Sequence, residues 1–407
     1  MKVGLAVHNF PPEFLGGTEQ VVLALARAHI AAGDEVFVLA GSEERVPGGD
    51  LRREDYDEVP VFRLRRDPEE NYGLEGYRTT GERITDLFYE ERPDGVHVHH
   101  WATLGWDVCQ RAAALGIRAG VTLHDLWTAC PRFFRRPPEG TRCPAEDERD
   151  SCVDCIGADM PEQSSEQVAE GIAKRDEQLH RELKCATFLA APSEAQARLI
   201  EHHLPWRGRV EIVPHGLLSR IEEKATPRGP EDPLRVGTFG NLVAEKGVDL
   251  LVEALGECGD QVELIVSGAA PDPAYIEGLR ALAHERGVPF RWTGPYDAGD
   301  RHPAMDLDLA VFPSLCDESY GLVVDEALAR GVPVVVSSRG ALPERARHGG
   351  VVVRSGGVMP LKVTLSSLLR SQRKLQSLRD AIPTTFPHIN EAAARYRGFF
   401  GHAEVLQ

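Results

Sequence analysis

The feature that most constrains the fold is a series of short apolar runs that stops near the middle of the chain and then starts again. The first run, at 3–8, leads through a loop into a helical stretch. Thr18 is suited to the N-cap of that helix, and Gly33 to its C′ position. A second apolar run at 36–39 completes a β-loop-α-β unit. Repeats of this unit predict a parallel sheet wrapped by helices.

The remaining runs fall into two series. The first series continues at 61–62, 95–98, 121–123, 188–191 and 210–213, and the second comprises 235–240, 262–267, 290–293, 309–312 and 332–337. Between them, 219–233 is charged, contains proline and lacks apolar periodicity, as is typical of a linker. A last segment with a helical pattern, 390–400, follows the second series. The sequence therefore predicts an α/β protein with two Rossmann-like domains in tandem, at 1–215 and 216–387.

Length and charge restrict the function. The chain has 407 residues, which favours two domains over one. Its formal net charge of -17 opposes binding to nucleic acid, which depends on clustered Lys and Arg. Basic runs at 63–66 and 132–136 could meet a phosphate or an anionic membrane, but solvated loops are the preferred interpretation. Peripheral membrane contact therefore has no further support, and nucleic acid is not an expected partner.

The sequence contains no targeting or membrane signal. It begins with a short β-like run rather than the apolar region of a signal peptide, and no stretch reaches the ~18 apolar residues of a membrane span. We therefore expect a cytoplasmic protein. Its eight cysteines would normally stay reduced there, so a cysteine cluster indicates metal before disulfide.

The most specific segment is 313–335. A strand ends at Phe312, a loop carries Glu318, and a helix begins near Gly321. The free N–H groups of that helix end and its dipole form an anion site suited to a diphosphate. Glu326 follows Glu318 by eight positions, and spacing alone would fit an exposed pair on an ordinary helix. The whole flanking context argues against that simple interpretation.

This segment resembles the E-x7-E signature of the retaining GT-B glycosyltransferases of family 4, followed by their A-x-G-x-P-V strand. The resemblance implies that Glu318 contacts hydroxyls of the donor sugar and that Glu326 contacts the ribose hydroxyls. Carboxylates suit this task because each can accept two hydroxyl hydrogen bonds. The residues between them complete the expected donor-binding turn: Ser319, Tyr320, Gly321, Leu322 and Val323.

A second match lies at 240–247, which resembles the family's G-R-L-x-x-x-K-G turn, whose Lys and Arg clamp the diphosphate. Lys246 stands at the Lys position, and Asn241 stands where Arg is usual. An amide supplies no charge and does not replace the bidentate fork of Arg. Losing one such group commonly reduces the rate by roughly 10²- to 10³-fold unless another cation compensates. The sequence does not identify that cation.

Two features of the N-terminal half resemble the family more weakly. Gly16 and Gly17 follow the first strand, as in the family's N-terminal donor loop, although a tight turn would explain them equally well. His124 matches a family His on the acceptor side, which implies a catalytic role in acceptor orientation or leaving-group contact. Three further histidines at a strand end could be structural or functional, and a metal site built on the first two lacks a third ligand: His97, His99 and His100.

Four cysteines in the loop 130–155 form a separate candidate site. Cys130, Cys143, Cys152 and Cys155 have the spacing C-x12-C-x8-C-x2-C, and four thiolates complete a tetrahedral zinc. A subset of family 4 has a similar Cys-bearing insertion after the His-Asp element, which implies that this loop shapes the acceptor side. Structural zinc is the preferred hypothesis. Free thiols or disulfides are the alternative, and a redox or Fe–S role has little support.

The resemblance implies a GT-B enzyme with an N-terminal acceptor domain and a C-terminal donor domain across a cleft, with the C-terminal helix, 388–407, crossing back to the first domain. It implies sugar transfer with retention from a UDP- or GDP-type nucleotide sugar to a glycan, lipid-linked or natural-product hydroxyl. Lys246, Glu318 and the amides near Gly321 would stabilise the leaving diphosphate and the oxocarbenium-like sugar, with no catalytic metal.

Two alternatives to this enzyme stay open. One is a GT-B epimerase or phosphorylase, although the sequence offers no recognisable pyridoxal lysine for a phosphorylase. The other is a non-catalytic nucleotide-sugar sensor or scaffold. The missing Arg at position 241 and the Cys-bearing loop favour that second alternative.

Overall fold

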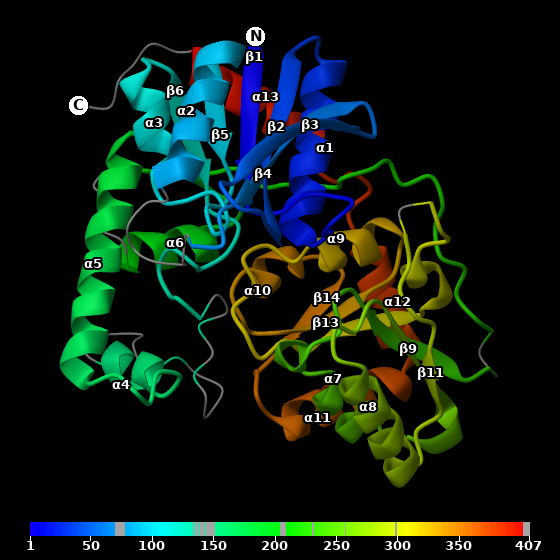
Figure 1. The fold of residues 1–407 in the computed structure, drawn as a ribbon. Coiled ribbons are helices and arrows are strands. Elements are labelled where there is room, and N and C mark those ends of the chain that lie inside the picture. The colour runs from blue at the N-terminus through cyan, green and yellow to red at the C-terminus, as the bar shows by residue number, and fades with distance from the viewer. Residues whose placement is uncertain are drawn as a thin grey trace. The chain divides into compact units, whose positions relative to one another are not determined.

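The computed structural model describes residues 1–69, 78–132, 135, 137, 143, 151–203, 209–229, 232–256, 258–297 and 299–401. The chain divides into two compact α/β units, each with its own sheet, mostly parallel in the first unit and entirely parallel in the second (Figure 1). The first unit comprises Met1–Phe133, Pro144–Ser219 and Pro387–Gln407, and the second comprises Phe134–Cys143 and Arg220–Phe386.

The first unit is built on an eight-stranded sheet in the order β3-β4-β2-β1-β5-β6-β7-β8. The strands are β1 (Lys2–Val7), β2 (Glu35–Arg45), β3 (Asp50–Tyr56), β4 (Val59–Arg66), β5 (Gly95–Val98), β6 (Arg118–Thr122), β7 (Ala186–Ala191) and β8 (Val210–Ile212). All pairings are parallel except that of β3 with β4. The strand order reverses between β1 and β5, so ligands of such a sheet are expected where these two strands end.

The antiparallel β3–β4 hairpin is the part of this sheet that apolar patterning does not predict. Strand β3 has the sequence DLRREDY and lies at the sheet edge, where charged side chains are common because they oppose pairing with another chain. Asp57 and Glu58 form the turn with φ of 52° and 65°. Two successive positive φ values match the tight turns that suit the twist of a hairpin.

Helices cover the first sheet. They are α1 (Gly17–Ala31), α2 (Arg78–Glu91), α3 (Val108–Ala114), α4 (Ser151–Gly157), α5 (Ser165–Lys184), α6 (Glu194–His203) and α13 (Ile389–Gly401). The C-terminal helix α13 packs beside α1 (Figure 1). Its Tyr396 is fully buried, and the Tyr396 hydroxyl lies 3.1 Å from Thr122 Oγ1 on β6. The C-terminal segment therefore completes the first unit although it follows the second in the chain.

The second unit has a six-stranded parallel sheet in the order β11-β10-β9-β12-β13-β14. Its strands are β9 (Leu234–Phe239), β10 (Val262–Ser267), β11 (Phe290–Trp292), β12 (Leu309–Phe312), β13 (Val334–Ser337) and β14 (Gly350–Val353), and its helices are α7 (Val248–Leu255), α8 (Pro273–Arg286), α9 (Leu322–Ala329), α10 (Leu342–Arg345), α11 (Val358–Leu369) and α12 (Gln372–Asp380). This is the dinucleotide-fold order, which reverses between β9 and β12.

Two hydrophobic layers sandwich the second sheet. Along β12, Leu309 and Val311 join one core cluster, and Ala310 and Phe312 join the other. This alternation follows from the two-residue period of a strand, and burial on both faces explains why the strands read as continuous apolar runs. None of the helices among the described residues has both the length and the apolar composition needed to cross a membrane.

Candidate functional site

The two loops that leave the reversal point of the second sheet lie against each other. One loop, 240–247, follows β9, and the other, 313–321, follows β12. The Leu315 amide donates to the Glu245 carbonyl over 2.8 Å. Gly247 has φ of 66°, and a Cβ there would lie 2.7 Å from the Pro313 carbonyl oxygen. Glycine is therefore required at this close approach.

Lys246 and Glu318, both predicted site residues, meet at this point. Lys246 Nζ lies 2.6 Å from Glu318 Oε1, and the Ser314 hydroxyl donates to the same oxygen over 2.7 Å. Burial opposes both charges, but the Glu318 carboxylate raises the pKa of Lys246, and Lys246 lowers the pKa of Glu318. The two side chains therefore form a charged pair at neutral pH. The side chains are 30% and 18% exposed, so a ligand can reach them.

Helix α9 begins beside this pair. Gly321 is its N-cap with φ of 89°, and a Cβ there would lie 2.9 Å from Leu342 Cδ2. Its first-turn carboxylate, Asp325, accepts hydrogen bonds from the Tyr320 hydroxyl (2.8 Å) and from Arg345 Nη2 (2.6 Å). Asp325 and the Tyr320 side chain are therefore internal supports of the turn.

Glu326, the second glutamate of the motif, has aromatic neighbours that sequence reasoning missed. His302 Nε2 lies 3.5 Å from Glu326 Oε2. The His302 ring contacts the rings of Phe239 and Tyr296, with centroids 5.0 Å and 5.7 Å away. Burial together with the nearby Glu326 charge raises the pKa of Tyr296. This combination of carboxylate and aromatic rings is suited to a ribose and its base.

In the first unit, histidines gather where the strands of the sheet end. His8 follows β1, His99 and His100 follow β5, and His124 follows β6. His99 Nδ1 and His124 Nε2 are 2.7 Å apart. Burial lowers the pKa of both rings well below the usual value, so both are neutral near pH 7. One ring then donates to the other, so the tautomers of the two rings are linked.

The structure separates the three histidines whose roles the sequence left open. His97 is fully buried, and its Nε2 lies 2.8 Å from Thr122 Oγ1 in the core beneath α13. His99 contacts His124, whereas His100 Nε2 lies 3.3 Å from Asp125 Oδ2. His97 is therefore a core residue, and His99 and His100 position the His124-Asp125 element.

Gly16 is the N-cap of α1 and Gly17 is its first residue, so the helix begins two positions before the start expected from an N-cap at Thr18. The Gly16 amide donates to Glu19 Oε2 over 3.0 Å, and Glu19 Oε1 lies 3.4 Å from His8 Nε2. Burial raises the pKa of Glu19 to about 7 and lowers the pKa of His8 to about 3. Sequence reasoning missed Glu19. The available signal was an acidic residue three positions after a helix N-cap.

The four cysteines of the expected zinc site are not brought together by the described structure. Cys152 and Cys155 lie on α4, whereas Cys143 belongs to a segment grouped with the second unit. Among the described residues, which include all four cysteines, no group of three or more His, Cys, Asp or Glu side chains is arranged to hold a metal ion. Most of the intervening loop lies outside the described residues, so structural zinc stays a prediction.

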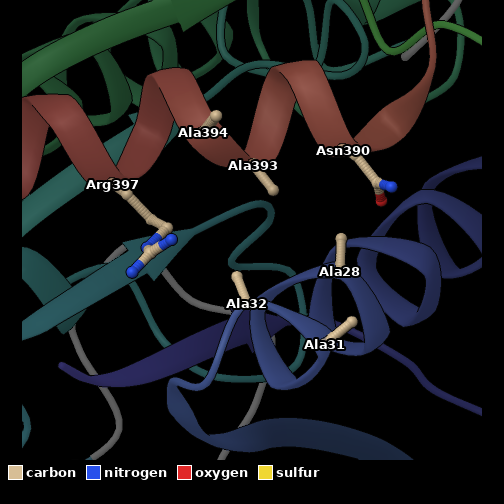
Figure 2. A pocket seen from close by; sticks show the side chains of 7 residues that line it. All are labelled: Ala28, Ala31, Ala32, Asn390, Ala393, Ala394 and Arg397. Atoms are coloured by element: carbon tan, nitrogen blue, oxygen red, sulfur yellow. The ribbon is translucent and has the colours of Figure 1, made fainter.

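A pocket between α1 and α13 contains none of the predicted site residues. Figure 2 shows its lining, which is formed by Ala28, Ala31 and Ala32 of α1 and by Asn390, Ala393, Ala394 and Arg397 of α13. Arg397 Nε is bound to Asp34 Oδ2 at 2.9 Å. Its lining is mostly alanine, and the charge of Arg397 is already paired with Asp34. We therefore interpret this pocket as a packing gap between two helices rather than as a binding site.

Comparison with known proteins is consistent across the chain. Residues 15–217 match the family model Glycosyltransferase Family 4, and residues 233–371 match the model Glycosyl transferases group 1. The chain is 38% identical over 376 residues to a D-inositol 3-phosphate glycosyltransferase from Xylanimonas cellulosilytica, covering 83% of this chain and 80% of that protein. It is 36% identical over 166 residues to a GDP-mannose-dependent alpha-(1-6)-phosphatidylinositol monomannoside mannosyltransferase from Mycobacterium tuberculosis. That alignment covers 37% of this chain and only 42% of the mycobacterial protein.

Solved structures match over almost the whole chain. Sucrose-phosphate synthase from Thermosynechococcus elongatus has a TM-score of 0.66 at 19% identity, with 98% of this chain and 99% of that chain covered. HepE from Anabaena, solved in complex with UDP and glucose, has a TM-score of 0.65 at 15% identity over the same shares. These likenesses confirm the two Rossmann-like α/β domains expected from the sequence.

Proposed function

Because the chain belongs to glycosyltransferase family 4 and has the GT-B fold, we propose that it is a retaining glycosyltransferase that uses a nucleotide-diphosphate sugar. The observation that carries this proposal is the Lys246–Glu318 pair, held 2.6 Å apart at the reversal point of the second sheet and beside the first turn of α9. A partly exposed cation, free helix amides and a carboxylate together suit a diphosphate with a hydroxyl-rich sugar attached.

Five of the predicted residues then have a task on the donor. The amides of Gly321 and Leu322 bind phosphate oxygens, and Lys246 neutralises the charge of the leaving diphosphate. Glu318 accepts hydrogen bonds from sugar hydroxyls. Glu326 accepts hydrogen bonds from the ribose, with Tyr296 and His302 beside it to contact the base.

We propose a front-face displacement without a covalent enzyme intermediate. The bond between the anomeric carbon and the phosphate oxygen breaks, and its electron pair leaves with the nucleoside diphosphate. The acceptor oxygen bonds to the same face of the sugar, and its proton passes to a phosphate oxygen of the leaving group. Lys246 and the α9 amides stabilise the charge that grows on that group. His124, neutral and held by His99, would orient the acceptor hydroxyl.

The relatives support only the chemical class of the donor and the chemical class of the acceptor. HepE binds UDP, and one relative is described as GDP-mannose-dependent, which supports a UDP- or GDP-type donor. Both named relatives act on inositol-containing acceptors, which supports a hydroxyl acceptor on a glycan, a lipid-linked polyol or a small natural product. Structural zinc in the Cys-bearing loop is a separate proposal, tested by the metal content of the purified protein.

The first test is thermal stabilisation by nucleotide sugars. Purified protein is screened against UDP-, GDP-, ADP- and TDP-sugars, with Glu326→Ala and a control, Glu277→Ala, whose side chain is 72% exposed on α8. Ligand at 100 times Kd stabilises the fold by about 2.7 kcal/mol, which shifts the melting temperature visibly. We expect one nucleotide class to stabilise the wild type and the control but not Glu326→Ala. No response to any donor would overturn the proposal.

A second experiment follows the fate of the bound donor and distinguishes a glycosyltransferase from a non-catalytic sensor and from an epimerase. A donor that binds and is slowly hydrolysed, or transferred to added polyols, supports the transferase. A donor that binds tightly and returns unchanged after long incubation supports a non-catalytic sensor. Conversion of the sugar nucleotide into its epimer supports an epimerase.

A further inference from the structure

The two sequence motifs of the proposed donor site supply little positive charge to balance a diphosphate. The cation that the family motif provides at position 241 is replaced by Asn241, which is exposed. The remaining motif cation, Lys246, is already matched by Glu318 at 2.6 Å. A second carboxylate, Asp317, lies directly before Glu318 in the chain. A diphosphate entering this site therefore needs a cation from outside the two motifs.

Two arginines from distant parts of the sequence lie at Asp317. Arg135 Nη1 is 3.8 Å from Asp317 Oδ2, and Arg339 Nη1 is 3.8 Å from Asp317 Oδ1. Both distances exceed the 2.7–3.2 Å range of an N–H···O hydrogen bond, so the arginines balance the charge of Asp317 without spending those donors on it. Three cations, counting Lys246, thus face two carboxylates. Among these five side chains, positive charge exceeds negative charge by one.

Arg339 is fixed by the loop that supports Glu318. The next residue, Gly340, has φ of 53°, and a Cβ there would lie 2.1 Å from the Glu318 carbonyl oxygen. The Ala341 amide donates to that same oxygen over 2.7 Å. Arg339 is therefore placed by the backbone next to Asp317. Its charge is the natural match for that carboxylate.

With Lys246 assigned to Glu318 and Arg339 to Asp317, Arg135 is the remaining cation. Its side chain is only 3% exposed, and Nη2 has no hydrogen-bond partner among the described residues. Burying a guanidinium with an unsatisfied N–H group is unfavourable, commonly by about 1–3 kcal/mol, unless a ligand completes it. The segment Phe134–Cys143, which carries Arg135, is grouped with the second unit, whose loops form the proposed donor site.

We infer that Arg135 binds the diphosphate of the donor and supplies the positive charge that Asn241 lacks. The inference rests on the proposed function and names a further residue of the same site. The planar guanidinium can donate two parallel hydrogen bonds to phosphate oxygens, which an ammonium cannot do. The Cys-bearing loop thus contributes to donor binding, in addition to the acceptor-side role expected from its position after His124.

The test measures the dissociation constants of UDP and GDP by calorimetry on the full chain. We expect Arg135→Ala to weaken binding of the recognised nucleotide by about tenfold or more, the range of a lost charge-assisted hydrogen bond. Arg135→Lys should recover only part of this, because it restores the charge without the fork. Arg280→Ala, on an exposed side chain of α8, is the matched control and should bind like the wild type.

A rescue experiment makes the assignment specific. Asn241→Arg should change the affinity of the wild type by less than about threefold, since Arg135 already supplies the cation. In the Arg135→Ala background, the same change should restore most of the lost affinity. Equal effects of Asn241→Arg in both backgrounds would overturn the inference. If Arg135→Ala is unstable, the milder Arg135→Gln is paired with Asn241→Arg in the same way.

The two proposals fail in different ways. If the wild type binds none of the nucleotides, the proposed function itself is wrong. If the wild type binds one nucleotide and Glu326→Ala weakens it, but Arg135→Ala binds as tightly as the wild type, the donor site stands and the role of Arg135 is wrong.

Discussion

His99 Nδ1 lies 2.7 Å from His124 Nε2, and both rings are buried and neutral. A neutral imidazole has one donor and one acceptor, so this contact links the tautomers of the two rings: only one of the two facing nitrogens carries a proton. His124 in turn stacks on His215 with centroids 4.9 Å apart and planes 16° from parallel. The ring that the family resemblance places on the acceptor side is thus fixed in orientation, and its tautomer is linked to that of His99.

Removing His99 should therefore impair the reaction through His124. We expect His124→Ala to reduce kcat by about 10²-fold, and His99→Ala by roughly tenfold with little change in donor KM, because the donor-binding residues proposed above come mainly from another unit. His99→Gln, which can still hydrogen-bond, should recover part of the loss. The ¹⁵N chemical shifts of His124 check the mechanism. The tautomer populations that they report should differ between the wild type and His99→Ala, and an unchanged pattern would contradict a positioning role.

Variants of the Lys246–Glu318 pair should show different effects on unfolding free energy and on activity. Lys246→Ala leaves the Glu318 carboxylate uncompensated, so we expect a loss of about 1–3 kcal/mol in unfolding free energy together with a roughly 10²- to 10³-fold lower kcat/KM. Lys246→Met combined with Glu318→Gln removes both charges and should recover most of the stability. Its activity should remain low. Denaturant unfolding and initial rates measure the two effects, and recovery of activity in the double variant would show that the pair is merely structural.

Sequence reasoning predicted five of the six strands of the second sheet, all except β14, because the information in those runs is local. Apolar runs mark strands that are buried on both faces, and the two motif loops follow such strands directly. The contact between Lys246 and Glu318 spans 72 positions, but it follows from the order of β9 and β12 in a dinucleotide fold. A recognised fold therefore supplies long-range contacts that periodicity alone does not.

The rest was not predictable for a physical reason. Side chains such as Glu19 and His302 follow no repeating pattern, because their neighbours are set by the tertiary fold. Arg135 lay in a basic run that the sequence showed, but its partner Asp317 comes from a distant part of the chain. The β3–β4 hairpin was missed since an exposed edge strand need not be apolar. Patterns report the average environment of a segment. They do not report the partner of an individual charge.

The buried histidines should make the fold acid-sensitive. Burial lowers the pKa of His8 to about 3 and also lowers those of His97, His99 and His124. A lowered folded-state pKa means that the unfolded chain binds more protons below pH ~6.5, so stability is lost as pH falls through that value. Each such histidine should remove about 1.4 kcal/mol at pH 5.5. Urea unfolding at pH 7.5 and 5.5 measures the loss, and His8→Gln should reduce it by about that amount.

Glu19 should have the opposite effect from the histidines on the pH dependence of stability. Burial raises its pKa to about 7, so the folded state holds a proton that the unfolded chain releases above pH ~4.5. Stability from this group therefore falls as pH rises from 4.5 to 7, by roughly 2 kcal/mol between pH 5.5 and 7.5. The several histidines outweigh this single carboxyl. In Glu19→Gln the compensating term is gone, and the loss of stability on acidification from pH 7.5 to 5.5 should be steeper than in the wild type.

We expect that even alanine is poorly tolerated at position 340, because the Glu318 carbonyl oxygen lies against Gly340. Its φ is 53°, and a Cβ would fall 2.1 Å from the Glu318 carbonyl oxygen, so Gly340→Ala must displace the loop that carries Glu318. Gly287 has a similar φ of 67° at the end of α8, with nothing within 4 Å of a Cβ. Gly287→Ala should therefore lose only about 1 kcal/mol from backbone strain and keep full activity. Gly340→Ala should lose more stability and at least tenfold in kcat/KM. Equal behaviour of the two variants in unfolding and rate assays would show that the Glu318 loop tolerates movement, and that its position is not what the chemistry requires.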